Sequence, residues 1–121
     1  RHIEAFAISP DGSSIAWNDE TGVIYTSEQG EKPRRIGMGR DPAWHPTKSW
    51  LIYAGARLSG RKITGYDLRV TNLKTPGKWL THTQHSDERY PNWYPGSRKI
   101  IYTKMRTTDL YWLRIKKKLK F

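Results

Sequence analysis

The segment His82-Thr83-Gln84-His85 could in principle bind a metal ion, because Asp87 and Glu88 follow it closely. Two imidazoles and a carboxylate are ligands that zinc accepts. A zinc site also needs neighbouring groups that hold its ligands in place, and nothing in this polar stretch indicates them. We therefore interpret the segment as a polar loop, and we predict no metal site and no cofactor.

Catalytic chemistry is not indicated either. The chain has no cysteine, which removes thiolate nucleophiles, thiolate metal sites and disulfides. Its serines lie in turn-like segments, and no Gly-x-Ser-x-Gly motif is present. The eleven acidic residues also lie mostly in turns, where a pair suited to proton transfer is not expected. We predict that the protein is not an enzyme.

The chain is strongly basic. Twenty-two Lys and Arg residues against eleven Asp and Glu give a net charge of +11, and the pI is near 10.1. This excess favours acidic partners such as nucleic acid, anionic lipid or an acidic protein, although a solvated basic surface is the simpler alternative. No run of about eighteen apolar residues predicts a membrane span.

One motif occurs three times, with turn prolines at Pro10, Pro46 and Pro95. An apolar residue follows each proline at the fifth position and an aromatic residue at the seventh; these pairs are Ile15 and Trp17, Leu51 and Tyr53, and Ile100 and Tyr102. Proline sets φ for a tight turn, and residues such as Asp-Gly tolerate the remaining angles. Each copy therefore predicts a strand, a tight turn and a second strand.

Short β-strands account for most of the chain. Alternating apolar residues between turn signals predict strands at Glu4–Ile8, Ser14–Asn18, Val23–Ser27, Arg34–Ile36, Pro42–His45, Trp50–Ala54, Tyr66–Asn72, Lys78–Thr81, Tyr90–Tyr94, Lys99–Lys104 and Asp109–Ile115. The second repeat is longer than the first, and its extra residues are predicted as two loops, Gly55–Thr64 and His82–Arg89. Inserted loops of repeat proteins often lie on the binding face.

These repeats resemble those of TolB-type β-propellers, a WD40-like family whose repeat also occurs in prolyl-oligopeptidase-like peptidases. The resemblance is carried by Ser9-Pro10-Asp11-Gly12, Ile15-Ala16-Trp17, Ile24-Tyr25, Gly30-Glu31 and Arg34-Arg35-Ile36. The second and third repeats keep the proline but lose Asp-Gly. The resemblance implies an all-β fold, a β-propeller of antiparallel four-stranded blades. One partial domain over residues 1–121 would contain blade one (4–37), blade two (41–81) and an incomplete blade three (90–121).

Three blades do not close a ring, because propellers use about four to eight. Two copies could therefore form a homodimer with six blades, the blades could belong to a longer chain, or a partner could cap an open array. We favour the homodimer. The family resemblance also implies a periplasmic or cell-envelope location.

A basic rim is the predicted binding site. If the strand order follows the family, the loops opposite the proline turns share one rim, and Arg in such loops can pair with acidic groups. The predicted partner-binding residues are Arg40, Arg57, Arg61, Lys62, His82, His85, Arg89, Lys104 and Arg106. The expected function is a non-enzymatic scaffold for protein–protein interaction that binds an acidic protein.

Two alternatives remain at this point. Lys and Arg beside thirteen Trp and Tyr could bind nucleic acid, with phosphate contacts and base stacking. Against this, the repeat register predicts a core role for the aromatics Trp17, Trp44, Tyr53, Trp93 and Tyr102. The other alternative is the propeller part of a larger peptidase-like protein.

Overall fold

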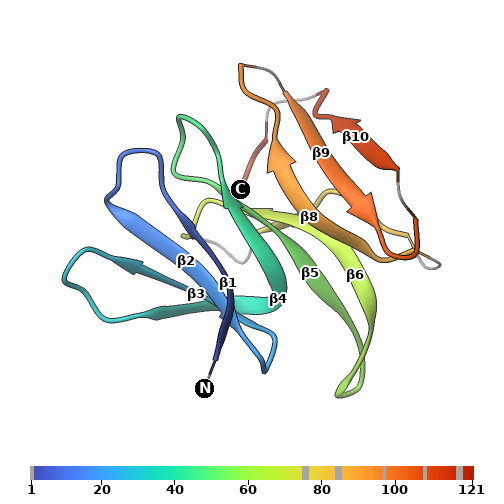
Figure 1. Ribbon diagram of the computed structural model, residues 1–121, viewed down its shortest axis with the longest axis horizontal. Coiled ribbons are helices and arrows are strands. Elements are labelled where there is room, and N and C mark those ends of the chain that lie inside the picture. Colours follow the sequence, from blue (N-terminus) through green and yellow to red (C-terminus); the bar gives the residue numbers. More distant parts are fainter. Residues whose placement is uncertain (1, 75–76, 84–85, 97, 108, 117–118) are drawn as a thin grey trace.

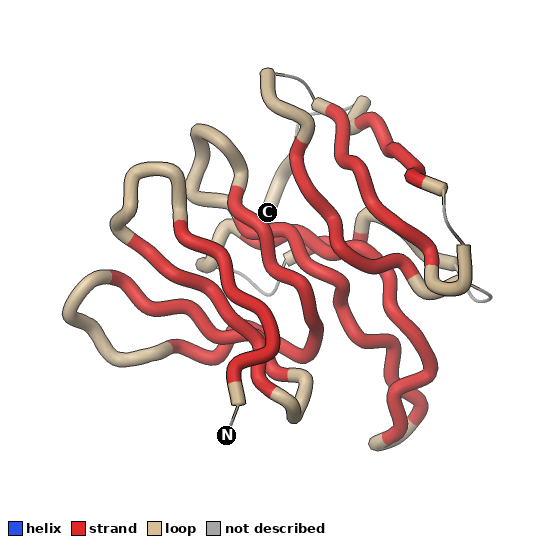
Figure 2. The backbone as a smooth tube through the Cα atoms, viewed as in Figure 1, coloured by secondary structure: helices blue, strands red, loops and turns tan. Residues whose placement is uncertain are grey.

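The computed structural model describes residues 2–74, 77–83, 86–96, 98–107, 109–116 and 119–121. Over these residues the chain forms ten β-strands and no helix (Figures 1 and 2). The strands are β1 (Ile3–Ile8), β2 (Ser14–Asp19), β3 (Val23–Glu28), β4 (Arg34–Trp44), β5 (Leu51–Ser59), β6 (Lys62–Thr71), β7 (Lys78–Trp79), β8 (Glu88–Trp93), β9 (Lys99–Lys104) and β10 (Leu110–Arg114). The predicted all-β class is confirmed.

The strands form two antiparallel meanders. Strands β1 to β7 make one curled sheet in sequence order, and β8 to β10 make a second sheet, also in order. Blade one consists of β1 to β3 and the start of β4, and blade two consists of the end of β4 and β5 to β7. Blade three has three strands among the described residues, β8 to β10, which agrees with the incomplete last blade expected from the sequence.

Strand β4 links blades one and two without a break. Its first part pairs with β3, as at Met38 and Val23, and its second part pairs with β5, as at Gly39 and Gly55. The direction changes at Asp41, which has a positive φ of 58° next to a register shift. Such bulges bend a strand. Strand β8 has the same kind of bulge at Tyr90, which has a φ of 54° and lies at a register shift.

The core lies in two layers between successive blades. Between blades one and two, the buried side chains are Ala16, Ile24, Leu51 and Tyr53. Between blades two and three, they are Ala43, Ile52, Leu68, Val70, Trp93, Ile100 and Tyr102. The C-terminal residues Leu119 and Phe121 also pack on this second layer, with the Phe121 ring 5.4 Å from the Trp50 ring. Core positions predicted at Tyr53, Trp93 and Tyr102 are confirmed.

The proline turns are stabilised by local side chains. In the first turn, Asp11 Oδ1 accepts hydrogen bonds from the Ser13 amide at 2.9 Å and the Ser9 hydroxyl at 2.8 Å. In the second turn, His45 Nδ1 accepts the amides of Thr47 and Lys48 at 3.1 and 3.0 Å. In the second turn the His45 imidazole therefore accepts the backbone amides, as the Asp11 carboxylate does in the first turn.

Three sequence predictions are wrong. The predicted loop Gly55–Thr64 is instead an extension of β5 and β6, paired from Gly55 with Asp67 to Ser59 with Lys62, because Gly60 at φ 61° forms a tight turn. The strands predicted at Arg34–Ile36 and Pro42–His45 form one continuous strand, β4, so only the predicted break between them is wrong. Trp17 is not a core residue: it is half-buried on the outer face of blade one, where its ring stacks on Tyr25 at 5.8 Å.

Candidate functional site

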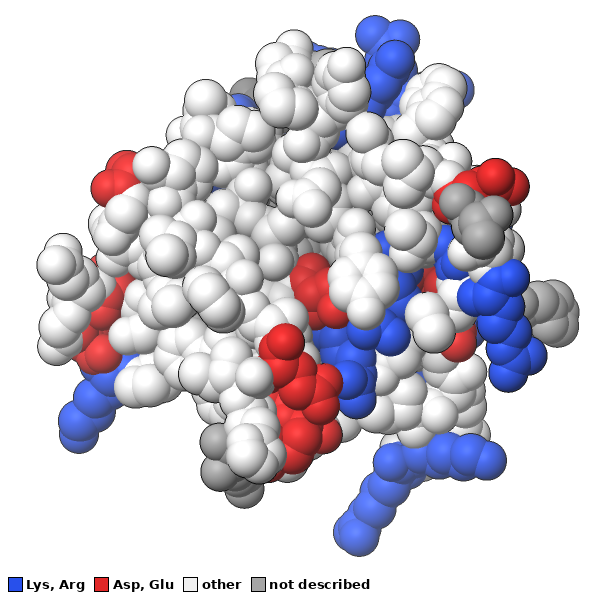
Figure 3. Space-filling view, in the orientation of Figure 1, with Lys and Arg blue, Asp and Glu red and all other residues white. Residues whose placement is uncertain are grey.

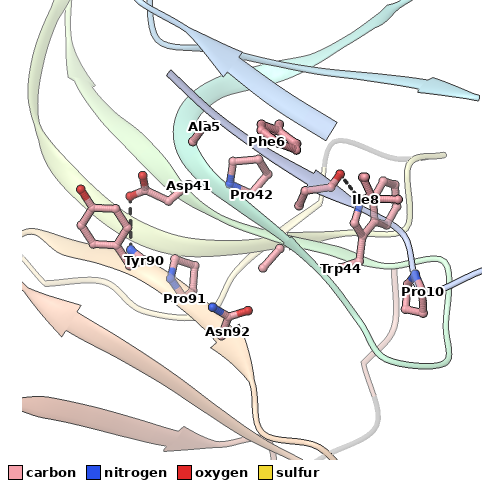
Figure 4. Close-up of a pocket in the computed structure, with 12 residues that line it drawn as sticks. Ala5, Phe6, Ile8, Pro10, Asp41, Pro42, Trp44, Tyr90, Pro91 and Asn92 are labelled. Atoms are coloured by element: carbon pink, nitrogen blue, oxygen red, sulfur yellow. Dashed lines mark hydrogen bonds between the residues drawn. The ribbon is translucent and has the colours of Figure 1, made fainter. Parts of the chain in front are cut away.

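The first strands of the three blades line a groove of about 410 Å³ (Figure 4). Strand β1 contributes its residues from Ala5 to Ile8, β4 contributes Asp41–Trp44, and β8 contributes Tyr90–Asn92. The Trp44 indole donates to the Ala7 carbonyl at 3.0 Å, and the Tyr90 amide donates to Asp41 at 3.2 Å. These bonds join blade two to blade one and blade three to blade two along the groove.

Two predicted binding residues are parts of this framework. Arg40 Nη1 lies 2.6 Å from Glu4 Oε2, and its Nε donates to the Tyr66 hydroxyl at 2.9 Å. Arg89 binds Asp41 with two bonds, Nε to Oδ2 at 2.5 Å and Nη2 to Oδ1 at 3.2 Å. Arg40 therefore joins blade two to blade one, and Arg89 joins blade three to blade two. Their charges are already compensated within the chain.

Arg57 is also used internally. Its Nη1 lies 3.1 Å from Asp67 Oδ2 and donates to the Ser86 carbonyl at 3.2 Å and to the Thr83 carbonyl. Its Nη2 lies 3.4 Å from Asp87 Oδ1. Only 18% of the side chain is exposed. Arg57 thus fixes the connection between blades two and three.

A buried acid pair lies beside Arg57. Burial, together with a hydrogen bond to Asp67 and the charge of that residue, raises the pKa of Glu88 to about 7. Burial acts in the same direction on Asp67, but hydrogen bonds from Glu88, Thr83 and Arg57 outweigh it and lower the pKa of that carboxyl. Two carboxylates in contact cannot both ionise at low cost, so one proton is shared between them.

Threonine hydroxyls enclose the acid pair. Thr83 Oγ1 lies 2.8 Å from Asp67 Oδ1 and 3.2 Å from both Glu88 oxygens, and Thr81 Oγ1 donates to Glu88 Oε2 at 3.0 Å. Asp67 is 3% exposed and Glu88 is 1% exposed. Separated pKa values in adjacent carboxyls can mark an acid and a base. Here the burial leaves no surface for a substrate, and the pair acts as a link between blades.

The segment considered as a possible metal site lies in the connection between β7 and β8, where residues 81–83 and 86–87 form neither helix nor strand. In the described part of the chain, no group of three His, Cys, Asp or Glu residues could hold a metal ion. His85 lies outside the described residues. The Asp87 carboxylate pairs with Arg57 and accepts a hydrogen bond from the Tyr66 amide at 3.3 Å.

The remaining predicted residues are at two turns and one loop. Arg61 and Lys62 are exposed at the end of the β5–β6 hairpin, Lys104 and Arg106 flank the β9–β10 turn, and His82 is exposed after β7. In Figure 1 the β5–β6 turn lies at the lower right and the β9–β10 turn at the right edge, both away from the proline turns, and Figure 3 shows Lys and Arg side chains projecting on that side. None of the four Lys and Arg residues at these turns forms an ion pair with a described residue. We call Arg61, Lys62, Lys104 and Arg106 the basic edge.

Comparison with known proteins rests on structure. No protein family model and no curated protein matches the chain in sequence. TolB from Acinetobacter baumannii superimposes with a TM-score of 0.73 over 95% of this chain and 30% of its own, at 17% identity. A protein described as TolB in Agrobacterium tumefaciens gives a TM-score of 0.70 over 90% of this chain and 41% of its own, at 23% identity.

The chain has a TolB-like β-propeller fold. At these identities the likeness shows the fold alone, and it confirms the family resemblance in the repeats as a structural one. The chain spans less than half the length of either TolB structure. Over the described residues, no helix is long and apolar enough to span a membrane.

Sequence reasoning missed the groove and the acid pair. The groove requires three strands separated by tens of residues, which only the fold brings together. For the acid pair, one local signal existed: Thr81 and Thr83 alternate beside Glu88, as they would if their hydroxyls faced one buried acid.

Proposed function

We propose that the protein is a non-enzymatic scaffold that binds an acidic protein through the basic edge. The observation that carries this proposal is the contrast between two sets of cations. Arg40, Arg57 and Arg89 are held by carboxylates of the chain itself. The cations of the basic edge have no such partner among the described residues; Arg61, Lys62 and Arg106 are exposed, and Lys104 is half-buried over the Tyr111 ring.

The buried acid pair supports the non-catalytic part of the proposal. Asp67 and Glu88 share a proton and are almost completely buried where blades two and three meet. Their hydrogen bonds end on Thr81, Thr83 and Arg57, so they are already used in holding the fold together.

A protein partner is favoured over nucleic acid by the location of the aromatic residues. Single-strand binding sites combine cations with exposed aromatic faces on which bases stack. Tyr111 beside the basic edge is covered by Lys104, whose Nζ lies 4.4 Å from the ring centre. The aromatic side chains that are more than half exposed, Phe6, Tyr90, Tyr94 and Trp112, are not residues of the β5–β6 or β9–β10 turns that carry the basic edge. The basic edge therefore offers charge and hydrogen-bond donors, which suit carboxylates on a protein surface.

Two further parts of the proposal come from the propeller fold. A periplasmic or cell-envelope location follows the resemblance to TolB-type propellers. A homodimer that closes a six-bladed ring would cover the two sheet faces that the chain leaves open at blades one and three.

Matched charge reversals test the basic edge. Arg61→Glu/Lys62→Glu changes two cations of the basic edge, and Lys32→Glu/Arg35→Glu changes two exposed cations near the start of β4 by the same charge. The probe is a fluorescent peptide rich in Asp and Glu, with binding followed by anisotropy. We expect the first variant to weaken binding about tenfold and the second by less than about twofold, because local complementarity exceeds the effect of net charge.

Two outcomes would contradict the proposal. Equal losses in both variants would mean that net charge alone attracts the peptide. Tighter binding of a single-stranded DNA or RNA oligomer, with affinity that falls steeply as salt rises, would favour the nucleic-acid alternative.

A further inference from the structure

The three blades pack on one another by a single rule. Residues at the fifth and seventh positions after each turn proline face the preceding blade: Leu51 and Tyr53 pack on Ala16 and Ile24 of blade one. Ile100 and Tyr102 pack in the same way on Ile52 and Val70 of blade two. The intervening position faces the following blade, as Ala16 and Ile52 do. Each blade therefore has a preceding face and a following face.

Blade one exposes its preceding face. Ile15 and Trp17 occupy the positions that Leu51 and Tyr53 fill in blade two, where both are completely buried. On β1, Phe6 is 63% exposed and Ile8 is 61% exposed, whereas Pro42 and Trp44 at the equivalent positions of β4 are buried and half-buried. We call Phe6, Ile8, Ile15, Trp17 and Tyr25 the leading face.

Blade three exposes its following face. Leu110 and Trp112 pair across the sheet with Thr103 and Ile101, as Leu68 and Val70 do with Ala54 and Ile52 in blade two. Leu68 and Val70 are completely buried, but Leu110 is 69% exposed and Trp112 is 62% exposed. We call Ile101, Leu110 and Trp112 the trailing face. Residues that are core in blade two are thus surface in blade three.

The two open faces belong to oppositely charged blades. Blade one (4–37) contains six acidic and three basic residues, a net charge of −3. Blade three (90–121) contains one acidic and nine basic residues, a net charge of +8. Lys99 adds a cation directly at the trailing face, with its Nζ 4.8 Å from the Trp112 ring centre. Like faces would repel each other, whereas the leading and trailing faces attract.

We propose that the trailing face of one copy packs on the leading face of a second copy, by the same rule that joins blades within the chain. This inference rests on the homodimer in the proposed function and identifies the surfaces that meet. The contact is head-to-tail, so two copies have two identical contacts and close a ring. Phe6 and Trp17 of each copy then take the places that Pro42 and Tyr53 take within the chain.

Three glutamate substitutions test the contact by solution mass, measured by sedimentation equilibrium. Phe6→Glu changes the leading face, Leu110→Glu changes the trailing face, and Leu58→Glu is the control on the β5–β6 hairpin. All three side chains are at least half exposed in one copy, at 63%, 69% and 50%, so the variants should fold. Circular dichroism checks that they do.

We expect the unmodified chain and Leu58→Glu to have about twice the 14.2 kDa mass of one copy. Phe6→Glu and Leu110→Glu alone should each remain at 14.2 kDa, because every head-to-tail contact needs both faces. An equimolar mixture of the two variants should recover the double mass, since one intact leading face meets one intact trailing face.

Three outcomes would overturn the proposal. One is an unmodified chain that is monomeric, and another is a dimer that survives either substitution alone, which would indicate like faces in contact. The third is a mixture that stays monomeric. Anisotropy with the acidic peptide on monomeric Phe6→Glu separates this inference from the basic-edge proposal, because Arg61 and Lys62 are unchanged in that variant.

Discussion

The contact between blades one and two differs from the contact between blades two and three. In the first, β4 continues through both blades, and four buried side chains form a small apolar layer. In the second, β7 and β8 belong to different sheets, and seven buried side chains form a larger layer. Arg57, Asp67 and Glu88 add a buried ionic cluster to the second contact, whereas a buried hydrogen bond of 3.1 Å from the Asp41 amide to Asn18 Oδ1 crosses the first.

This difference shows how a propeller positions blades when the sheet does not continue. A shared strand fixes the neighbouring blade through its backbone, so four buried side chains suffice between blades one and two. Blade three lacks such a strand, and its orientation depends on a larger apolar layer, on Arg89 with Asp41, and on the shared proton between two acids. Side-chain changes should therefore have larger effects at the second contact.

The largest expected loss comes from Trp93→Ala. Trp93 is 7% exposed, and its ring lies 4.6 Å from His45 and 6.4 Å from Trp50. Removing a buried tryptophan side chain leaves a cavity and should lower the free energy of unfolding by about 3–5 kcal/mol. Urea denaturation measures the change. Leu58→Ala, on an exposed hairpin, should change it by less than about 0.5 kcal/mol.

An intermediate effect is expected from the ion pairs at the two contacts. Arg89→Met should cost about 2–3 kcal/mol, because Asp41 is 7% exposed and would lose two charged hydrogen bonds. Arg40→Met should cost less than about 1 kcal/mol, because Glu4 is 40% exposed and water can replace the arginine. Equal costs for the two variants would show that both contacts depend on their ion pairs to the same degree.

The shared proton predicts a pH dependence with a defined sign. Folding raises the pKa of Glu88 from 4.5 to about 7, so its contribution to stability is complete below 4.5 and is lost as pH rises through 7. Asp67 has the opposite sign: its lowered pKa adds stability above 3.8 that is lost under more acidic conditions. Between pH 4.5 and 7, stability should therefore fall as pH rises.

Glu88→Gln isolates this pH dependence. Glutamine keeps the shape and can donate to Asp67, but it cannot titrate. The urea midpoint of the variant should change less with pH than that of the unmodified chain, measured from pH 4.5 to above 7. Identical pH profiles would assign the slope to another group and remove the role of the acid pair.

Part of this architecture could be predicted from the sequence, because it is local. Pro10, Pro46 and Pro95 set the turns, and alternating residues after them form β2, β5 and β9. Tyr53 and Tyr102 are correctly predicted as core because a preceding blade covers each of them. Trp17 has the same position in the repeat, yet no blade among the described residues packs on its side of blade one. Repeat position determines which way a side chain points, but burial also requires a neighbour.

The candidate site could be predicted only in part. Composition and loop position predict a basic rim, and Arg61, Lys62 and Arg106 are exposed, but their role in binding stays a prediction. The structural roles of three arginines could not be predicted. Arg40 and Arg89 pair with carboxylates that are 36 and 48 residues away in the sequence. Arg57 pairs with Asp67 on the neighbouring strand of the same hairpin. Arginine in a loop looks the same in sequence whether it binds a partner or its own chain.

Amide hydrogen exchange as a function of pH tests the difference between the two contacts most directly. After correction for intrinsic exchange rates, the free energy of opening at β9 should fall relative to that at β2 as pH rises from below 4.5 to above 7, because Glu88 then loses its proton. The same measurement on Glu88→Gln should show no such divergence. Parallel changes at β9 and β2 in the unmodified chain would contradict a proton-dependent attachment of blade three.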